Sequence, residues 1–554
     1  MRSKVSKAGL TLQAIAGTHV VLLGMNMPKK QCSGLLGFAI RRTDETEREA
    51  YWLSGFKTFE SVVPQPAQGM SYSSHQHPIQ GFTWSDYSAK PEHDYTYEIV
   101  ALRGTPKDLV EAEKVTVKVT TEQEKDAKTT HHVHFNRGVA ASQAYTRRFG
   151  DKSPKQVGQA AFDWLSRGAA EAIRDFIGRA KSKDWGLRVG AYEFTDDHVL
   201  QSLKDAWKKS KADVKVLYHA RNDSQKKANE SAIANFDIGT ICLPRNAPGL
   251  ALSHNKTIVL THKGVAKAVL TGSTNYSEGG IYGHSNVVHI CEEPDIAAKY
   301  LQLWDELAKN VKRSLVCPIL ATLSPLPKAA SKGTTAIFSP RPDLTALERY
   351  AADAKNAKDA LFATFAFGMN PLFQDAYKNG KAGLRYALME KLSGPTKTDA
   401  QRKANEKAIN DLRSMEQNKI AVGAFLSQGA FDRWAKEKLS GLNVNVRYLH
   451  TKYMLVDPLG ENPLVISGSA NFSKASTESN DENMLYIRGD KRVADIYLGE
   501  FMRLYSHFAF RDWLSTHPDP SNAKVEFLDE TNTWWQSYFG TSFASRQRQY
   551  FAGA

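Results

Sequence analysis

The chain has 554 residues, a length that accommodates about three domains. Its content of 42% hydrophobic and 24% charged residues is ordinary for a globular protein and excludes a disordered or fibrous chain. The formal net charge of +14 is spread almost evenly along the sequence, so no separate basic arm is expected. Such a surface attracts nucleic acid and anionic lipid alike, and charge alone does not choose between them.

Cysteine usage and hydropathy bear on the location of the protein. The four cysteines show neither metal-ligand spacing nor paired clustering, which indicates reduced thiols. Gln13, Thr18 and His19 interrupt the apolar segment near the N-terminus, which favours a loop and strand over a signal peptide. No apolar run approaches the roughly 20 residues of a spanning helix, so we expect no stable membrane insertion. The expected location is the cytoplasm, with export without a cleaved signal peptide as the open alternative. The cysteines are Cys32, Cys242, Cys291 and Cys317.

Residues 1–145 consist of short alternating or β-branched runs separated by turn residues. THVVLLGMNM, GLLGFAIRR and YTYEIVALRG are examples, and the pattern predicts an antiparallel sandwich. The segment GFTWSDYSAKPEHDYTYEIVALRGTP resembles a fibronectin type III repeat, with Trp84 as a core aromatic and Tyr97 near a corner. We therefore predict an all-β, fibronectin III-like or immunoglobulin-like sandwich, which contributes positioning or partner binding rather than chemistry.

Two groups of histidines in this region have the residue type of metal ligands. The first is His75 and His77; the second is His131, His132 and His134. No cysteine or pair of carboxylates completes either set in the sequence. We therefore interpret them as solvated strand or loop histidines and predict no metal site.

The remainder of the chain repeats a strand, turn and helix pattern. LRVGAYEFTDDHVLQSLKDAW in the first half and DALFATFAFGMNPLFQDAY in the second both have it. QKKANESAIANF from Gln225 and QRKANEKAINDL from Gln401 each predict the start of a helix. We predict two α/β lobes with mainly parallel strands, over residues 150–325 and 333–554, related by a pseudo-twofold axis.

A His-x-Lys tripeptide occurs once in each predicted lobe. The first is His254-Asn-Lys256 and the second is His450-Thr-Lys452. Each is followed by an apolar, strand-like run and a Gly-Ser-x-Asn turn, and the spacing from histidine to asparagine is 21 residues in both copies. The equal spacing predicts one active site built from two halves, with the imidazole rings within about 8 Å of each other. The downstream turns contribute Ser273 with Asn275 and Ser469 with Asn471.

These residue types suit phosphoryl transfer. Two lysines neutralise the oxygens of an anionic phosphodiester, and the asparagine amides and serine hydroxyls donate to the remaining oxygens. One imidazole attacks phosphorus and forms a phosphohistidine, while the other protonates the leaving oxygen and then activates water. The arrangement requires neither a metal nor a cofactor. Because the two halves lie in one chain, we expect a monomer.

The two blocks resemble the H-x-K-x4-D…G-S-x-N motifs of the phospholipase D superfamily. The second block matches fully and includes Asp457 and the later Glu482-Asn483. The first block has Thr261 at the aspartate position and His284-Ser285-Asn286 where an acidic residue precedes the asparagine. The resemblance implies a supporting role for Asp457 and a hydrogen bond from a catalytic histidine to Glu482.

The resemblance also implies that His254 is the nucleophile, whereas the second block by itself favours His450 as the better-oriented ring. We expect Glu482 to bond His450, or its neighbour across the cleft, and we take Ser285 as the uncharged counterpart of Glu482. On this interpretation His254 is deprotonated and attacks, while His450 beside Glu482 is the acid.

The sequence therefore predicts a phosphodiesterase. Because GSANFSKASTESNDENMLYI is similar to the block of small bacterial endonucleases of this superfamily, nucleic acid is the first expected substrate. The alternative is a phospholipase D that hydrolyses phospholipids such as phosphatidylcholine to phosphatidic acid. A silent phosphate-binding module is a third possibility, which the two intact His and Lys pairs disfavour.

Overall fold

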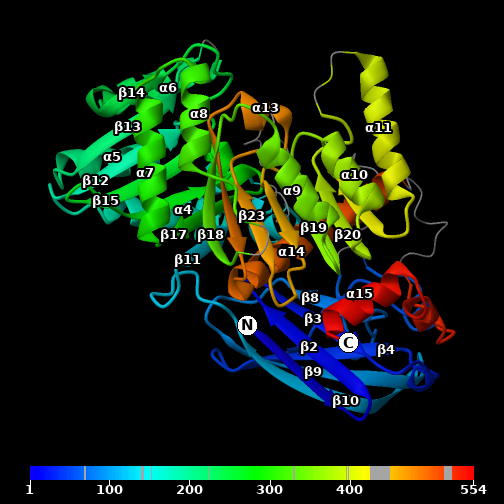
Figure 1. Ribbon diagram of the computed structural model, residues 1–554. Helices are drawn as coiled ribbons and strands as arrows, with labels where there is room; N and C mark the ends of the chain where they lie inside the picture. The colour runs from blue at the N-terminus through cyan, green and yellow to red at the C-terminus, as the bar shows by residue number, and fades with distance from the viewer. Residues whose placement is uncertain are drawn as a thin grey trace.

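The computed structural model describes residues 1–67, 70–138, 142–150, 152–221, 224–328, 331–394, 396, 398–423, 449–516 and 527–554. Two α/β lobes lie side by side, and a β-sandwich lies beneath them, as Figure 1 shows. The two large sheets have the same strand order, which confirms the predicted pair of lobes.

The N-terminal sandwich is built from two antiparallel four-stranded sheets, β1-β2-β3-β8 and β10-β9-β4-β5. Alternate residues of β9, including Tyr95, Tyr97 and Ile99, point into a core that draws on both sheets. Trp84 packs partly buried against this core, and the Tyr97 hydroxyl donates to Asp86. The strands are β1 Arg2–Lys7, β2 Leu10–Ala16, β3 Val21–Asn26, β4 Gly37–Asp44, β5 Glu49–Trp52, β8 Thr83–Asp86, β9 Asp94–Thr105 and β10 Asp108–Thr120, with a small β6–β7 pair at Ser54–Gly55 and Tyr72–Ser73.

Each lobe contains a seven-stranded mixed sheet. The orders are β11-β17-β16-β15-β12-β13-β14 and β18-β24-β23-β22-β19-β20-β21, so every strand of the first sheet has a counterpart in the second. The first sheet comprises β11 His131–Phe135, β12 Trp185–Ala191, β13 Asp213–His219, β14 Cys242–Arg245, β15 Lys256–His262, β16 Val265–Gly272 and β17 Val287–Cys291. The second comprises β18 Gly333–Ser339, β19 Ala360–Phe365, β20 Leu384–Met389, β21 Asn418–Val422, β22 Tyr453–Val456, β23 Leu464–Gly468 and β24 Glu482–Arg488.

The prediction of mainly parallel strands is wrong. Only the last three strands of each order are parallel to one another, and the remaining neighbours pair antiparallel. The cause is the short connection after the His-x-Lys strand: Lys263 and Gly264 both have positive φ and turn β15 directly into β16. A connection of this length permits only an antiparallel hairpin.

Two predicted domain boundaries differ from the contacts in the structure. β11 lies within the range expected for the sandwich, but it pairs with β17 in the first lobe. At the other end, the helix α15 (Phe543–Ala552) packs on β3 of the sandwich, and Trp534 and Tyr538 pack against the same core. The histidines of β11 are consequently buried and not solvated, because this edge strand pairs with β17 and packs against α4 and α14.

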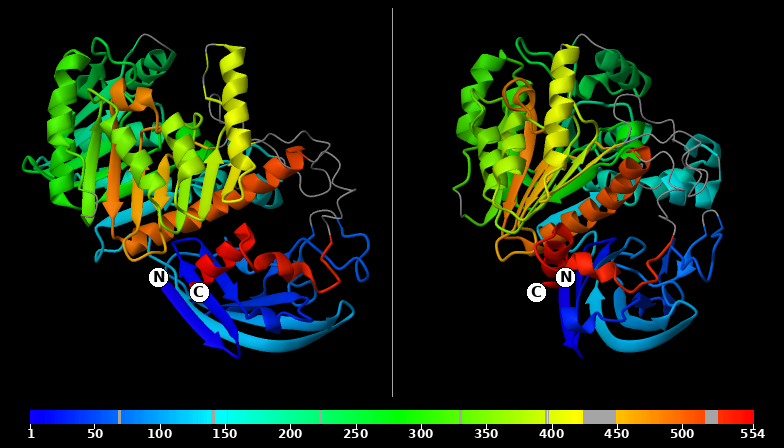
Figure 2. Two further views of the ribbon diagram at one scale, coloured as in Figure 1. Left: turned by 45° about the vertical axis from the view of Figure 1, so that its right-hand side comes forward. Right: turned by 90° about the vertical axis from the view of Figure 1, so that its right-hand side faces the viewer.

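The helices cover the sheets and connect the three parts. The predicted helices at Gln225 and Gln401 are confirmed as α6 and α11. The long helix α14 contacts strands of both lobes and β2 of the sandwich, and Figure 2 shows it between them. The helices are α1 Ser142–Phe149, α2 Pro154–Val157, α3 Gln159–Ser166, α4 Ala169–Gly178, α5 Asp197–Lys208, α6 Ser224–Asn235, α7 Pro294–Ala308, α8 Arg313–Leu323, α9 Thr345–Lys355, α10 Pro371–Asn379, α11 Asp399–Arg413, α13 Lys474–Glu478 and α14 Lys491–Thr516.

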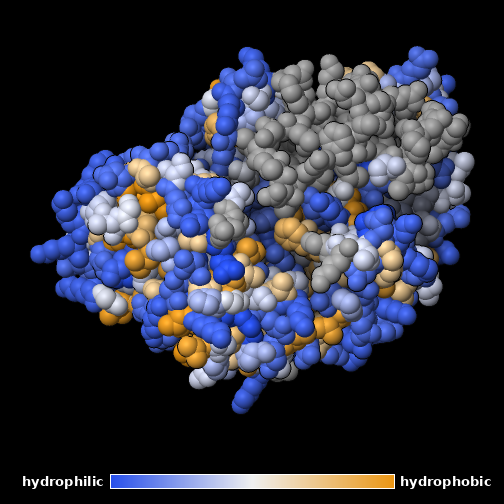
Figure 3. Space-filling model, turned by 90° about the horizontal axis from the view of Figure 1, so that it is seen from above, coloured by the Kyte–Doolittle hydropathy of each residue, from blue (hydrophilic) through white to orange (hydrophobic). Residues whose placement is uncertain are grey.

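One hydrophobic core spans the interface between the lobes. Val259 and Val269 of the first sheet, Val465 and Leu485 of the second, and Tyr497 of α14 belong to the same buried cluster. Each side chain of this size contributes about 1.5–3 kcal/mol on full burial, so this shared core holds the lobes together. Among the described helices, none is both long and apolar enough to span a bilayer. The face seen from above in Figure 3 is mostly hydrophilic, with apolar residues scattered among polar ones.

Candidate active site

The two His-x-Lys segments meet at the interface between the lobes. The ring centroids of His254 and His450 lie 6.5 Å apart with their planes at 76°, which agrees with the distance predicted for a shared site. Both rings are buried, with 5% of each residue exposed. Lys256 opens β15, and the corresponding Lys452 directly precedes β22, so the antiparallel hairpins of both lobes bring these ends together.

The backbone of the opposite lobe holds each of the two candidate histidines. The His254 N–H donates to the Asp481 carbonyl at 2.9 Å, and the His450 N–H donates to the Ser285 carbonyl at 3.2 Å. The two segments therefore cross between the lobes, and neither half of the site is complete without the other.

The side chain that orients each ring also comes from the opposite lobe. His254 Nδ1 lies 2.8 Å from Glu482 Oε2, and His450 Nδ1 lies 2.9 Å from Asn286 Oδ1. The expectation that Glu482 supports His450 as the acid is therefore wrong. Glu482 reaches across the interface to His254, which is the neighbour that the sequence left as the second option.

The sheet register also identifies which residue of the first lobe is the counterpart of Glu482. Gly272 pairs with Val288 in the first sheet and Gly468 pairs with Met484 in the second. Asn286 and Glu482 each lie two residues before these partners, so Asn286, and not Ser285 as expected from the sequence, is the counterpart of Glu482. The orienting group of His450 is a neutral amide.

Hydrogen-bond partners fix the tautomers of both neutral rings. The amide of Asn286 donates to the Gly280 carbonyl at 2.7 Å, so its oxygen faces His450 and accepts from Nδ1–H. Glu482 likewise accepts from His254 Nδ1–H. In both rings Nε2 carries the lone pair, and this nitrogen is the one available to a substrate.

Two buried lysines accompany the rings. Each ammonium donates to the backbone carbonyl of the histidine two residues before it in the sequence. Burial lowers the pKa of Lys256 to about 7, and burial beside Lys256 holds the pKa of Lys452 well below its usual range. Both shifts arise mainly from desolvation, and the carboxylates of Glu482 and Glu193 offset them only in part.

The imidazoles experience the same desolvation. Burial lowers the pKa of His254 to about 4, although Glu482 acts in the opposite direction. Burial next to Lys452 and His284 holds the pKa of His450 well below its ordinary value. Burial alone would raise the pKa of Glu482, but His254 and Lys256 bring it below the ordinary carboxyl value.

The asparagines of the two turns lie in equivalent environments. The side-chain oxygens of Asn275 and Asn471 are both buried without a hydrogen-bond partner among the described residues. Such groups are costly unless a ligand satisfies them, and an amide can present its N–H₂ to a phosphate after rotation.

The serines and the aspartate of the motifs bond the protein's own backbone and side chains, which fits the supporting role among the two expected for them. The Ser273 hydroxyl bonds Asn286 and the Val287 N–H, and the Ser469 hydroxyl bonds the Asn483 backbone, so both serines brace their turns against the next strand. Asp457 accepts the N–H groups of residues 358–360 at the start of β19, and it supports the fold without facing the cleft.

Several residues of the site were not identified from the sequence. The His284 ring lies 4.5 Å from His450 and accepts from the Asn286 amide, and burial lowers its pKa to about 3. The Tyr192 ring lies 4.9 Å from the His254 ring and 5.1 Å from the Lys256 ammonium. The HSN segment was visible as a departure from the motif, but Tyr192 follows β12 and carries no signal in the sequence.

The two lobes match a family described as "Cardiolipin synthase, PLD-like domain" over residues 173–308 and 354–505, which is just over half of the chain. The chain belongs to this phospholipase D-like family. Its lobes have the fold of phospholipase D-superfamily phosphodiesterases, and both His-x-Lys segments lie within the matched residues.

Relatives of the phospholipase D-like chain share part of its length. Two proteins named Phospholipase D, from Rickettsia bellii (strain RML369-C) and Rickettsia felis (strain ATCC VR-1525 / URRWXCal2), are each 30% identical over 139 residues. The match covers 25% of this chain and 62% of each relative, so the chain spans about three-fifths of their length.

Solved structures with similarity to the chain include three with different titles. Phosphatidylserine synthase of Haemophilus influenzae Rd KW20 is 13% identical, covers 65% of this chain and 92% of its own, and has a TM-score of 0.45. A phospholipase D family member, Nuc, from Salmonella typhimurium is 26% identical over 26% of this chain and 88% of its own, with a TM-score of 0.21. Yeast tyrosyl-DNA phosphodiesterase is 12% identical over 58% of this chain and 85% of its own, with a TM-score of 0.35.

Proposed function

We propose that this protein hydrolyses phosphodiester bonds through a covalent phosphohistidine, with nucleic acid as the substrate. The observation that carries the proposal is the charge balance of the cleft. Two buried lysines and two imidazoles converge there; Glu482 bonds His254, and together with Glu193 it compensates the lysine charges only in part. An anionic phosphodiester would supply the missing negative charge and be held between the two Nε2 atoms.

The nucleophile is His254, for a different reason than the sequence suggested. Attack by its neutral Nε2 on phosphorus leaves a positive charge on the ring, and Glu482 at 2.8 Å from Nδ1 stabilises that charge. The P–O bond to the leaving group breaks as the N–P bond forms. A ring beside a neutral amide would not receive this stabilisation.

The general acid is His450. Substrate binding places a negative charge beside this ring and favours its protonated form. Its Nδ1 partner is the Asn286 oxygen, which stabilises an imidazolium less than a carboxylate does, so the Nε2 proton is released readily to the leaving oxygen. In the second step His450 Nε2 takes a proton from water, whose oxygen attacks phosphorus and breaks the N–P bond.

Nucleic acid is proposed first because the net charge of +14 favours any polyanion and because the second motif block resembles that of small nucleases. A phospholipase D activity is the second candidate, since both curated relatives bear the name Phospholipase D. The site chemistry is the same for either phosphodiester, so the choice depends on the substrate.

A parallel assay distinguishes the two. We would incubate the full chain with labelled single-stranded DNA, duplex DNA and RNA, and with phosphatidylcholine vesicles, each with and without EDTA. Cleaved oligonucleotide without choline release supports the proposal. Choline release without cleaved oligonucleotide would identify phospholipids as the substrate. If no substrate yields either product, the proposed hydrolysis is contradicted.

Two variants and a matched control exclude contaminating activity. His254→Ala and His450→Ala should each reduce turnover by at least about 10³-fold, because each removes one of two obligatory groups. His262→Ala is the control, since His262 is the last residue of the same strand β15 and packs against Trp185 at the other end of the strand from Lys256. Cleavage that survives both histidine substitutions would contradict the mechanism.

A further inference from the structure

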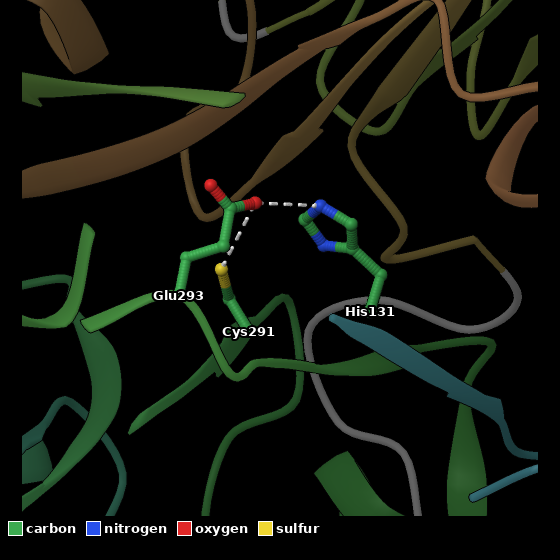
Figure 4. Close-up of side chains that lie close together, drawn as sticks. All are labelled: His131, Cys291 and Glu293. Atoms are coloured by element: carbon green, nitrogen blue, oxygen red, sulfur yellow. Dashed lines mark hydrogen bonds and ion pairs between the residues drawn. The ribbon is translucent and has the colours of Figure 1, made fainter. Parts of the chain in front are cut away.

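A second group of ligand-forming side chains lies at the edge of the first lobe. Figure 4 shows His131 of β11, Cys291 at the end of β17 and Glu293 at the start of α7 pointing toward one another. His131 and Cys291 are direct partners in the antiparallel pair β11–β17, so both side chains leave the same face of the sheet. The sequence analysis considered His131 only together with His132 and His134 and predicted no metal site there, because Cys291 and Glu293 lie about 160 positions further along the chain.

The spacing of the three donor atoms is close to that of a tetrahedral metal centre. His131 Nε2 lies 3.1 Å from Glu293 Oε1, Cys291 Sγ lies 3.9 Å from the same oxygen, and all three atoms lie within 4.8 Å of one another. Zinc bonds of about 2.0–2.3 Å place tetrahedral ligand atoms roughly 3.3–3.7 Å apart. Side-chain movements of about 1 Å would close the set around an ion.

A second observation, independent of the three donors, is the support behind His131. Its Nδ1 lies 2.9 Å from His289 Nε2, and His289 Nδ1 lies 2.9 Å from the Tyr497 hydroxyl. Histidines that bind a metal usually donate their other ring N–H to such a partner, which fixes the tautomer and the ring plane. Bound through Nε2, His131 would donate Nδ1–H to His289.

Burial and charge also fit a divalent cation. His131 and Cys291 are buried, whereas Glu293 is half-exposed and leaves a route from solvent. The Thr334 hydroxyl of β18 lies 3.0 Å from His131 Nε2 and donates to Glu293 Oε1, so it adjoins two of the three donor atoms. One thiolate and one carboxylate would balance the two charges of the ion, so the buried centre would be neutral.

We propose that His131, Cys291 and Glu293 bind one zinc ion, with water or the Thr334 hydroxyl in the fourth position. The mixed sulfur, nitrogen and oxygen donor set favours zinc among the divalent metals. On binding, the Cys291 thiol loses one proton to solvent and its sulfur forms the metal bond, while the imidazole and the carboxylate bind without further proton loss. With Thr334 as a ligand, the ion would link β11 and β17 to the neighbouring β18. Its role would be structural, and it would not take part in catalysis.

The test is a titration of the metal-free full-length chain with cobalt(II), a spectroscopic substitute for zinc, followed by competition with zinc. The wild type should bind one equivalent and develop a thiolate-to-cobalt charge-transfer band that zinc abolishes. Absence of that band, or a band that zinc leaves unchanged, would overturn the proposal.

Variants identify the ligands without using catalytic activity. Cys291→Ser should abolish the charge-transfer band, and Glu293→Gln should weaken cobalt binding at least tenfold. Because Glu293 is half-exposed, its variant keeps the test valid even if the Cys291 variant unfolds. Cys317→Ser, in α8, is the matched control and should retain full binding. Unchanged binding by Glu293→Gln, or loss of the band in Cys317→Ser, would contradict the assignment.

Discussion

At the scale of the residue, one carboxylate differentiates two chemically identical imidazoles. Glu482 bonds His254, and the neutral amide of Asn286 bonds His450. Glu482→Gln should lower kcat by about 10²-fold or more, because glutamine can still accept from Nδ1–H but cannot stabilise a cationic ring. Steady-state kinetics measures this, with Glu478→Gln of the nearby helix α13 as the control. A variant that kept more than about a third of the wild-type kcat would show that the charge is dispensable.

Anion binding to the cleft should take up protons. Burial lowers the pKa of Lys256 to about 7, so this lysine is not fully charged at pH 7.5, and burial also holds the pKa of Lys452 well below the ordinary lysine value. A bound phosphate raises both pKa values, and the site then gains protons from the buffer. Calorimetry of the binding of sulfate, a phosphate-like anion that does not titrate near neutral pH, should show uptake of about one proton at pH 7.5 in buffers of different ionisation enthalpy. A binding enthalpy that is independent of the buffer would contradict this account.

At the scale of the element, the segment that carries Glu482 is anchored by a buried ion pair between the lobes. Arg245 at the end of β14 donates to both carboxylate oxygens of Asp481, at 2.9 and 3.1 Å, and both side chains are fully buried. Asp481→Asn should lower the free energy of unfolding by about 3–5 kcal/mol, because it leaves the guanidinium without a charge partner. Urea denaturation measures the change. The double variant Arg245→Met/Asp481→Leu should recover part of the loss, and an unchanged midpoint in Asp481→Asn would exclude a structural role for the pair.

Elements whose signals are local could be predicted from the sequence, and those that depend on partners could not. The helices at Gln225 and Gln401 and the two strand–turn–helix units follow from periodicity, and the equal spacing of the His-x-Lys blocks predicted that His254 and His450 meet. The crossed pairing of Glu482 and Asn286 was not predictable in this way. This pairing depends on which lobe supplies each strand to the interface. The spacing of residues within one motif block contains no information about the partner lobe.

The buried position of β11 was missed for a related reason. Its three histidines are polar residues that suggest a solvent-exposed strand, and they follow the sandwich directly in the sequence. The strand is buried because β17, more than 150 positions later, pairs with it. A polar strand that owes its burial to a distant partner has no local hydrophobic signature.

At the scale of the whole molecule, buried neutral histidines predict acid sensitivity. Burial lowers the pKa of His254 to about 4, and those of His284 and His507 to about 3, whereas an unfolded histidine titrates near 6.5. Between these values the unfolded state binds more protons, so the stability present above pH 6.5 is lost as the pH falls toward the folded pKa values. The free energy of unfolding should therefore decrease by about 2 kcal/mol per such histidine between pH 6.5 and 5.

Urea denaturation at the two pH values tests this, and His284→Gln supplies the comparison. The variant has one titrating ring fewer, so its loss of stability between pH 6.5 and 5 should be smaller than that of the wild type by about 2 kcal/mol. Equal losses in the two proteins would show that His284 does not contribute to the acid sensitivity.

The central claim is that His254, supported by Glu482 from the opposite lobe, carries the phosphoryl group. The most direct measurement is alkaline quenching of the enzyme during turnover of a phosphodiester substrate, because the N–P bond survives alkali but not acid, followed by peptide mass spectrometry without an acidic step. The account predicts a phosphorylated peptide containing His254, an unmodified peptide containing His450, and accumulation of the adduct in His450→Ala with a substrate whose leaving group needs no proton. A phosphoryl group on His450 with His254 unmodified would contradict it.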